Sequence, residues 1–258
     1  MPFVAGVATR YHAPRMATAI AATRSLLAYI IILAYIAVAG PLGLFAAAVL
    51  RWKSALYALG HGGVWLALTV PGIRYRVVGR ENIPKEAVVF CSNHESNVDP
   101  PVLFESLHRR LHILYKAELH GFPIMGTVFD VGGFVPVDRA DRDQAMASIA
   151  RGAESLCAGN SFLIFPEGTR SRTGDLLPFK KGGFIMAIQA QVPVVPVAVQ
   201  GGRASMRKGS ALVRPVVVTV RVGRPIPTRG LTLEDRDRLI QRVRQEIVSL
   251  LALGPAAV

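Results

Sequence analysis

The first 80 residues of this chain contain no aspartate and no glutamate. The same stretch holds eight arginine and lysine residues, so it supplies eight of the 13 net positive charges of the whole chain. Basic segments that bind nucleic acid interleave these residues with polar and exposed aromatic side chains, whereas here they flank long apolar runs. The pattern therefore excludes a nucleic-acid partner and indicates an anionic membrane surface.

Cysteine is also scarce, with only Cys91 and Cys157 in 258 residues. Two cysteines exclude the disulfide framework of a small secreted domain, and both lie in apolar runs, so we expect two small core residues in a reducing compartment. Charged residues make up 18% of the chain and apolar residues 51%. This is rich in apolar residues for a soluble protein and poor for a multi-spanning transporter, and the length allows one substantial domain plus an appendage.

The longest apolar run covers residues 26–50, which carry no charge. As a helix it would exceed the roughly 30 Å hydrocarbon core of a bilayer, although Gly40-Pro41 should kink or break it and leaves a re-entrant or interfacial helical pair open. A second uncharged stretch, residues 54–73, is interrupted by "GHGG" and predicts an in-plane segment or a marginal span. A cleaved signal peptide is the alternative, because three arginines precede the first run, but that run is long for one.

Beyond residue 73, short apolar runs alternate with amphipathic helical patterns. This alternation predicts an α/β domain with a largely parallel mixed sheet flanked by helices. We therefore expect a membrane-anchoring helical region in residues 1–73 and a catalytic domain in residues 74–258, which the last helix closes. The expected strands are residues 75–79, 87–91, 112–115, 133–137, 162–165, 194–199 and 216–222, and the expected helices are residues 101–109, 118–131, 142–158, 182–191 and 233–251.

A histidine and an aspartate follow the second expected strand, in "NHESNVD". If that strand ends near Cys91, His94 and Asp99 lie in one tight turn, where the carboxylate can fix the imidazole tautomer and leave the other ring nitrogen as a base. A histidine near its usual pKa of about 6.5 suits removal of a hydroxyl proton at neutral pH. Alternatively, Asp99 merely caps the next helix.

A basic turn follows a later strand, in "FPEGTRSRTGDLLPFKK". Gly168 and the small polar residues around it expose backbone N–H groups, and Arg170 can make a bidentate pair with a phosphate. The alternative is a solvated basic loop. Two further segments, "GGFVPVDR" and "VPVVPVAV", repeat the layout less clearly; the second predicts a rigid, partly edge-like apolar strand because of its prolines.

Taken together and in this order, these four segments resemble the four motifs of the glycerolipid acyltransferase family, best known for its 1-acylglycerol-3-phosphate acyltransferases. The resemblance covers about residues 75 to 225, and its first and third motifs are highly specific. The second departs slightly, with Val135 and Pro136 where a longer aliphatic or Phe-Ile pair is usual.

The resemblance implies acyl transfer from acyl-CoA or acyl carrier protein to the sn-2 hydroxyl of 1-acylglycerol 3-phosphate, giving phosphatidic acid, with no metal or other cofactor. His94 would be the general base and Asp99 would orient it, without an acyl-enzyme. Glu167 would meet a glycerol hydroxyl or aim Arg170, since a carboxylate repels phosphate, and residues 192–199 would border the acyl or acceptor groove. The implied substrate-binding residues are Arg139, Glu167, Gly168, Thr169, Arg170 and Lys180.

The implied location is a bacterial inner membrane, with the catalytic domain on the cytoplasmic face where thioester donors are found. Three alternatives remain open from the sequence. The acceptor is another lysolipid, such as a lyso-ornithine lipid or a lysophospholipid with a larger head group. A serine-type lipid hydrolase would use Ser92 or Ser96 as its nucleophile. A catalytically silent lipid-binding protein would not need His94 at all.

Overall fold

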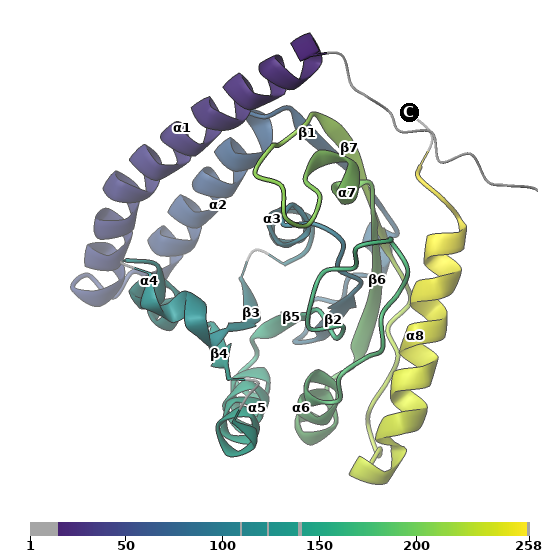
Figure 1. The fold of residues 1–258 in the computed structure, drawn as a ribbon. Coiled ribbons are helices and arrows are strands. Elements are labelled where there is room, and N and C mark those ends of the chain that lie inside the picture. Colours follow the sequence, from purple (N-terminus) through teal and green to yellow (C-terminus); the bar gives the residue numbers. More distant parts are fainter. Residues whose placement is uncertain (1–14, 109, 123, 139–140, 257–258) are drawn as a thin grey trace, which may run out of the picture.

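A computed structural model of the chain describes residues 15–108, 110–122, 124–138 and 141–256. Its centre is a seven-stranded sheet in the order β1-β7-β6-β2-β5-β3-β4 (Figure 1). Every neighbouring pair is parallel except β6 and β7, which confirms the predicted α/β class with a largely parallel sheet. The strands are β1 (Ile73–Val78), β2 (Val89–Ser92), β3 (Leu111–Lys116), β4 (Val135–Val137), β5 (Ser161–Ile164), β6 (Val194–Gln200) and β7 (Val216–Val222).

Helices cover both faces of this sheet (Figure 1). Four of the five helices predicted beyond residue 73 are present as single helices. The prediction of one helix over residues 118–131 is wrong, because the backbone of Ile124 has a φ of +67°, which no right-handed helix accommodates. The short helix α7 was not predicted. The helices are α1 (Arg15–Ala48), α2 (Lys53–Thr69), α3 (Asp99–Ser106), α4 (Met125–Val131), α5 (Arg142–Cys157), α6 (Gly182–Ala190), α7 (Gly202–Ser205) and α8 (Arg236–Ala252), with 3-10 turns η1 (Arg80–Asn82), η2 (Ala117–Gly121) and η3 (Leu233–Asp235).

The two faces of the sheet are packed into two separate cores. On β2, Phe90 joins the core beneath α2 and α3, whereas Val89 and Cys91 join the core formed with α5, α6 and α8. Successive side chains of a strand point to opposite faces, so a strand covered on both sides is apolar throughout. Cys91 is buried as predicted, but the prediction for Cys157 is wrong, because it is exposed at the end of α5.

Strand β6 lies inside the sheet, between β7 and β2, so the expectation of an edge-like strand is wrong. Pro196 is accommodated because its carbonyl accepts a hydrogen bond from Gly223, one residue beyond the end of β7. The proline nitrogen faces the same side, where no strand residue needs its missing N–H. Residues 194–199 are all buried, so this strand supports the site from within the core.

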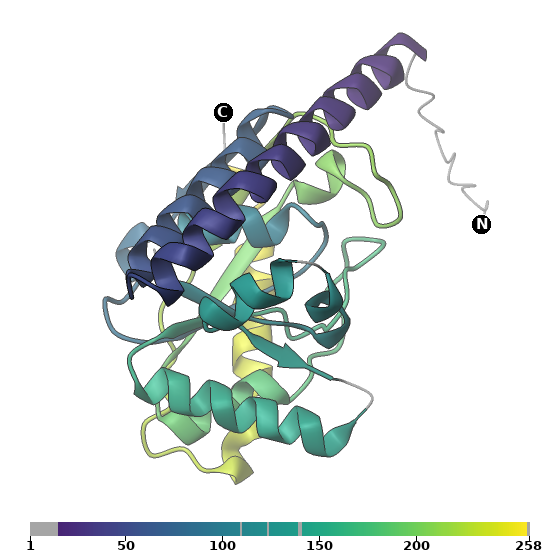
Figure 2. The same ribbon diagram turned by 90° about the vertical axis from the view of Figure 1, so that its left-hand side faces the viewer.

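The N-terminal part forms two helices that lie side by side, α1 and α2 (Figure 2). The predicted break at Gly40-Pro41 is wrong: α1 continues through Pro41, because one proline removes a single hydrogen bond from a helix of 34 residues. The "GHGG" segment does not interrupt α2 either. A Cβ atom on Gly62 would lie 2.6 Å from the hydroxyl of Tyr35, so this glycine lets the two helices approach closely.

The outer face of α1 is apolar and exposed. Leu26, Leu33 and Leu42 are each more than half exposed, an arrangement that is unfavourable in water. Residues 18–48 are long and apolar enough to cross a membrane. These features support membrane association through α1.

Candidate active site

The loops that follow β6, β2 and β5 meet at one edge of the sheet. Strand β2 lies between β6 and β5 and is parallel to both, so the three carboxyl ends point the same way. The loop after β2 carries His94 and Asp99, the turn after β5 carries Glu167 and Arg170, and the segment after β6 carries Lys208. The fold therefore brings the first and third sequence motifs together.

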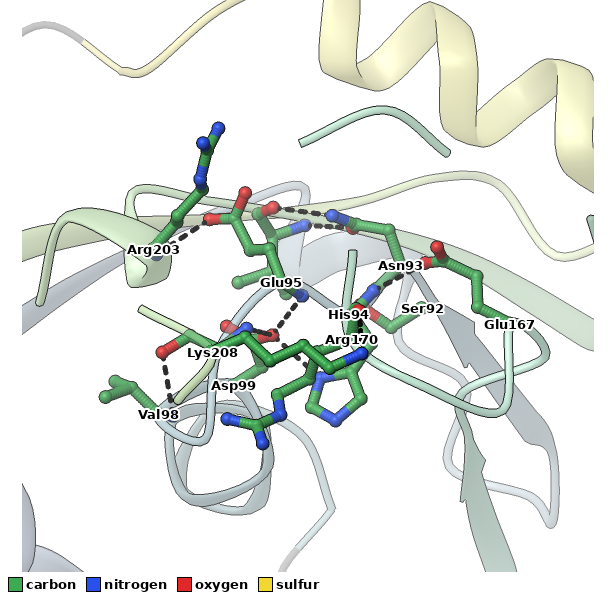
Figure 3. A network of polar contacts seen from close by, with 12 residues as sticks. Ser92, Asn93, His94, Glu95, Val98, Asp99, Glu167, Arg170, Arg203 and Lys208 are labelled. Carbon is green, nitrogen blue, oxygen red and sulfur yellow. Dashed lines mark hydrogen bonds and ion pairs between the residues drawn. The ribbon is translucent and has the colours of Figure 1, made fainter. Parts of the chain in front are cut away.

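His94 and Asp99 are hydrogen-bonded, with 2.9 Å between Nδ1 and Oδ2 (Figure 3). Asp99 is fully buried, and the same oxygen accepts hydrogen bonds from the backbone N–H groups of Glu95 and Ser96, each at 2.7 Å. Because a carboxylate only accepts, Nδ1 carries the proton and Nε2 keeps its lone pair. This is the arrangement of a general base held in one tautomer.

The imidazole is fixed from its face as well as its edge. The rings of His94 and Phe165 stack with 4.1 Å between their centroids. The backbone carbonyl of His94 accepts a hydrogen bond from the amide of Ser171 at 2.8 Å. These contacts attach the loop after β2 to the turn after β5, so His94 is positioned before any substrate binds.

Glu167 joins the same two segments. Its Oε1 accepts a hydrogen bond from the backbone N–H of His94 at 2.7 Å, and its Oε2 accepts one from the backbone N–H of Leu177 at 2.9 Å. Burial raises the pKa of Glu167, while the two amide donors partly offset that effect. Both oxygens are thus engaged within the protein, which explains how a carboxylate can stand in a turn suited to an anion.

The turn after β5 presents a positive charge that has no partner among the described residues. Arg170 is half-buried, and its guanidinium group forms no ion pair or hydrogen bond with any residue that the structure describes. Gly168 turns the chain with a φ of +69°, and the side chain of Lys180 packs against it. Thr169 is exposed, and Arg139 lies outside the described residues.

Three residues near the site were missed by the sequence analysis: Glu95, Gly202 and Lys208. The Glu95 carboxyl accepts hydrogen bonds from backbone amides at the start of α7, and burial, followed by the nearby Asp99, raises its pKa. A Cβ atom on Gly202 would lie only 2.4 Å from Oδ1 of Asp99. For Gly202 and Lys208 a signal was available, since "VQGGRASMRKGS" at the end of β6 repeats the pattern of an apolar strand followed by glycine and cations.

The serine hydrolase alternative can be compared with this geometry. Ser92 Oγ donates to the carbonyl of Asn93 at 3.0 Å, and Ser96 Oγ donates to the carbonyl of Met206 at 2.9 Å. Neither hydroxyl is hydrogen-bonded to His94, as a serine nucleophile would require. Within the described part of the chain, no group of three or more His, Cys, Asp or Glu residues could hold a metal ion.

Known proteins resemble this chain over most of its length. A family model described as "Acyltransferase" matches residues 74–200. A 1-acyl-sn-glycerol-3-phosphate acyltransferase from Limnanthes douglasii is 32% identical over 213 residues, which cover 80% of this chain and 75% of that protein. The 1-acyl-sn-glycerol-3-phosphate acyltransferase alpha of Homo sapiens is 34% identical over 181 residues, covering 69% of this chain and 64% of the human protein.

A solved structure agrees with these sequence relatives. The crystal structure of the 1-acyl-sn-glycerophosphate (LPA) acyltransferase PlsC from Thermotoga maritima superposes with a TM-score of 0.81 at 26% sequence identity. The match covers 93% of this chain and 99% of the Thermotoga chain, so it includes the N-terminal helices as well as the sheet.

Proposed function

This chain belongs to the acyltransferase family that includes the 1-acyl-sn-glycerol-3-phosphate acyltransferases, and on this premise we propose that it acylates the sn-2 hydroxyl of 1-acylglycerol 3-phosphate. The donor is the thioester of acyl-CoA or acyl carrier protein, and the product is phosphatidic acid. The observation that carries the proposal is the His94–Asp99 pair, attached to the turn that bears the unpaired Arg170 guanidinium.

In the proposed reaction His94 acts twice. Its Nε2 removes the proton of the acceptor hydroxyl as the oxygen attacks the thioester carbon, and Asp99 stabilises the imidazolium that forms. Collapse of the tetrahedral intermediate breaks the carbon–sulfur bond, and the departing thiolate takes the proton from His94. An ester replaces a thioester, and no covalent acyl-enzyme is formed.

The acceptor phosphate is assigned to the turn after β5. We propose that Arg170 binds it through paired N–H groups, with Thr169 supplying further donors and with Lys180 and Arg139 adding positive charge. Gly168 shapes the phosphate-binding turn through its positive φ. Glu167 holds the backbone of His94 through the contact described above, and so aligns the base with the phosphate-binding turn. Correct placement of both substrates supplies much of the rate enhancement.

The N-terminal region is assigned to the membrane. We propose that residues 1–73 anchor the protein and that residues 74–258 form the catalytic domain. The exposed apolar face of α1 supports this division, since a lysolipid acceptor keeps its tail in the bilayer while its head group enters the site. Thioester donors are cytoplasmic, so the catalytic domain is assigned to the cytoplasmic face of the membrane. In a bacterium this is the cytoplasmic face of the inner membrane.

The two rival activities are less consistent with the geometry. A serine hydrolase needs a hydroxyl that His94 can deprotonate, but Ser92 and Ser96 both donate to backbone carbonyls and are fully buried. Another lysolipid acceptor would use the same base. The unpaired cation after β5 favours an acceptor whose phosphate is a terminal monoester, because such a phosphate carries the larger negative charge.

The test offers the purified full-length protein in detergent a labelled acyl thioester and a panel of lysolipids. We expect phosphatidic acid from 1-acylglycerol 3-phosphate, and a roughly 10²–10⁴-fold lower kcat for His94→Ala. His120→Ala is the matched control, because His120 is exposed, and it should retain the wild-type rate. Equal rates for wild type and His94→Ala, or a product made only from a different lysolipid, would contradict the proposal.

A further inference from the structure

Lys208 brings a positive charge to the site from outside the four sequence motifs. It lies between α7 and β7, and its Nζ donates hydrogen bonds to Thr169 Oγ1 at 2.9 Å and to the carbonyl of Arg170 at 3.0 Å. In the view of Figure 3, the side chains of Lys208 and Arg170 border the imidazole of His94. The ammonium group of Lys208 therefore contacts the turn that carries the Arg170 guanidinium.

No carboxylate in the described part of the chain neutralises this pair of cations. Among the residues that the structure describes, none lies within ion-pair distance of Lys208 or Arg170. Two neighbouring positive charges repel each other, and an anion bound between them adds attractions that outweigh this repulsion. A bound anion with more than one negative charge would therefore stabilise this arrangement.

The turn also has spare hydrogen-bond donors. An ammonium group has three N–H bonds, and Lys208 uses two of them. Because Thr169 Oγ1 accepts from Lys208, the hydroxyl hydrogen of Thr169 is free to donate elsewhere. The backbone N–H groups of Thr169 and Arg170 form no hydrogen bond with other described residues. The hydrogen-bond donors available here are thus the guanidinium of Arg170, the ammonium of Lys208, the hydroxyl of Thr169 and the backbone amides of Thr169 and Arg170.

The segment that carries Lys208 is held in place on both sides. The carbonyl of Met206 accepts a hydrogen bond from Ser96 in the catalytic loop at 2.9 Å, and the amide of Val213 donates to Ser25 of α1 at 2.8 Å. Such anchoring fixes the lysine before a ligand arrives, which reduces the entropy lost on binding.

We propose that Lys208 binds a phosphate group of a substrate together with Arg170 and the Thr169 hydroxyl. The assignment rests on the proposed acyltransferase function. The phosphate belongs either to the lysophosphatidic acid acceptor or to the coenzyme A donor, both of which carry a phosphate monoester. A different role, in which Lys208 only ties its loop to the turn after β5, makes opposite predictions about charge.

Three variants separate the role of the Lys208 charge from a purely structural role of its hydrogen bonds. Lys208→Gln keeps an N–H donor but loses the charge, Lys208→Arg keeps the charge, and Arg207→Gln removes a charge from the exposed neighbour. KM is measured for 1-acylglycerol 3-phosphate at saturating acyl-CoA, and for acyl-CoA at saturating acceptor. KM does not depend on the amount of folded enzyme, so partial unfolding of a variant does not obscure the result.

We expect Lys208→Gln to raise one of these KM values about tenfold or more, and Lys208→Arg to stay within about threefold of wild type. The KM that rises identifies the source of the phosphate. Inhibition by glycerol 3-phosphate should weaken by a similar factor if the acceptor is that source. Arg207→Gln should match the wild type.

Failure of the Lys208 proposal can be distinguished from failure of the proposed function. If the wild type forms phosphatidic acid and Lys208→Gln has the KM values of Arg207→Gln, Lys208 does not bind phosphate, while the proposed function stands. The same conclusion follows if Lys208→Arg and Lys208→Gln lose activity equally, because charge is then irrelevant. If the wild type acylates no lysophospholipid, the proposed function itself fails.

Discussion

The carboxylate of Asp99 has almost no room to move. One oxygen accepts three hydrogen bonds, and the other is buried and has no hydrogen-bond partner in the described part of the chain. That second oxygen faces Gly202, where the backbone of the segment after β6 approaches the proposed catalytic pair. A glycine at this position lets the carboxylate lie where the imidazole needs it.

Substituting this glycine should therefore misplace the base. In Gly202→Ala the new methyl group would lie 2.4 Å from the Asp99 oxygen, so the carboxylate must move. We expect kcat to fall about 10²-fold, as small displacements of catalytic groups can do, with a smaller change in KM. Gly60→Ala is the control, since its methyl group would meet nothing within 4 Å. A normal kcat in Gly202→Ala would show that Asp99 has room to adjust.

The sequence predicted the residues whose chemistry is local, and missed those whose role depends on a distant segment. His94 and Asp99 lie five positions apart after an apolar run, so their pairing follows from the loop itself. Glu95 meets the amide of Arg203, which is 108 positions away in the sequence. No pattern along the chain announces such a contact, because it arises only when β2 and β6 become neighbours in the sheet.

At the scale of elements, β3 contains a buried histidine, His112. His112 packs against the rings of Tyr57 and Phe162, and a Cβ atom on Gly133 would lie 2.7 Å from its ring. Burial, followed by the positive charge of Lys53, lowers the pKa of His112 from 6.5 to about 4. The folded protein therefore holds this side chain neutral in the range where the unfolded chain binds a proton.

The sign of this effect makes acid destabilising. Between pH 6.5 and about 4 the unfolded chain binds a proton at this position and the folded protein does not, so the free energy of unfolding falls as the pH falls. From pH 7.5 to pH 5 we expect a loss of roughly 1–2 kcal/mol from His112. Urea denaturation of wild type and His112→Gln at both values measures it, with His120→Gln as an exposed control. Equal pH dependence in all three proteins would contradict the assignment.

Elements were predicted well where one physical cause dominates. Short apolar runs predicted all seven strands, although β1 alternates more buried and exposed residues. The errors occurred where tertiary contacts override a local rule. Proline did not end α1, Gly62 and Gly63 of α2 are contact positions against Tyr35, and the backbone of Ile124 separated η2 from α4. Helix α7 has only four residues, too few for a periodic pattern.

At the scale of the whole molecule, the exposed large apolar side chains are concentrated on the N-terminal helices. Leu26, Leu33 and Leu42 are each more than half exposed on α1, where lipid would cover them. A charged side chain in the centre of a membrane helix costs about 2.5–3.5 kcal/mol on insertion scales. Association with a bilayer should therefore depend strongly on these positions.

Replacing all three leucines by lysine should release the protein from membranes. We expect the fraction that floats with anionic vesicles to fall several-fold, although the added positive charge would favour the anionic surface. The matched control replaces three exposed apolar residues near the other end of the chain, Leu233, Val248 and Leu253, by lysine. Equal flotation of both triple variants would place the membrane-binding surface elsewhere.

The attachment of α1 to the segment before β7 has a further consequence. Val213 and Ala211 depend on Ser25 and Tyr29 for hydrogen bonds, so the first helix braces a segment that borders the catalytic centre. A truncated version starting after Ala48, made to obtain a water-soluble enzyme, would lose that brace together with the lipid anchor. Solubility and catalytic competence are thus coupled through one helix, and engineering the first by deletion would compromise the second.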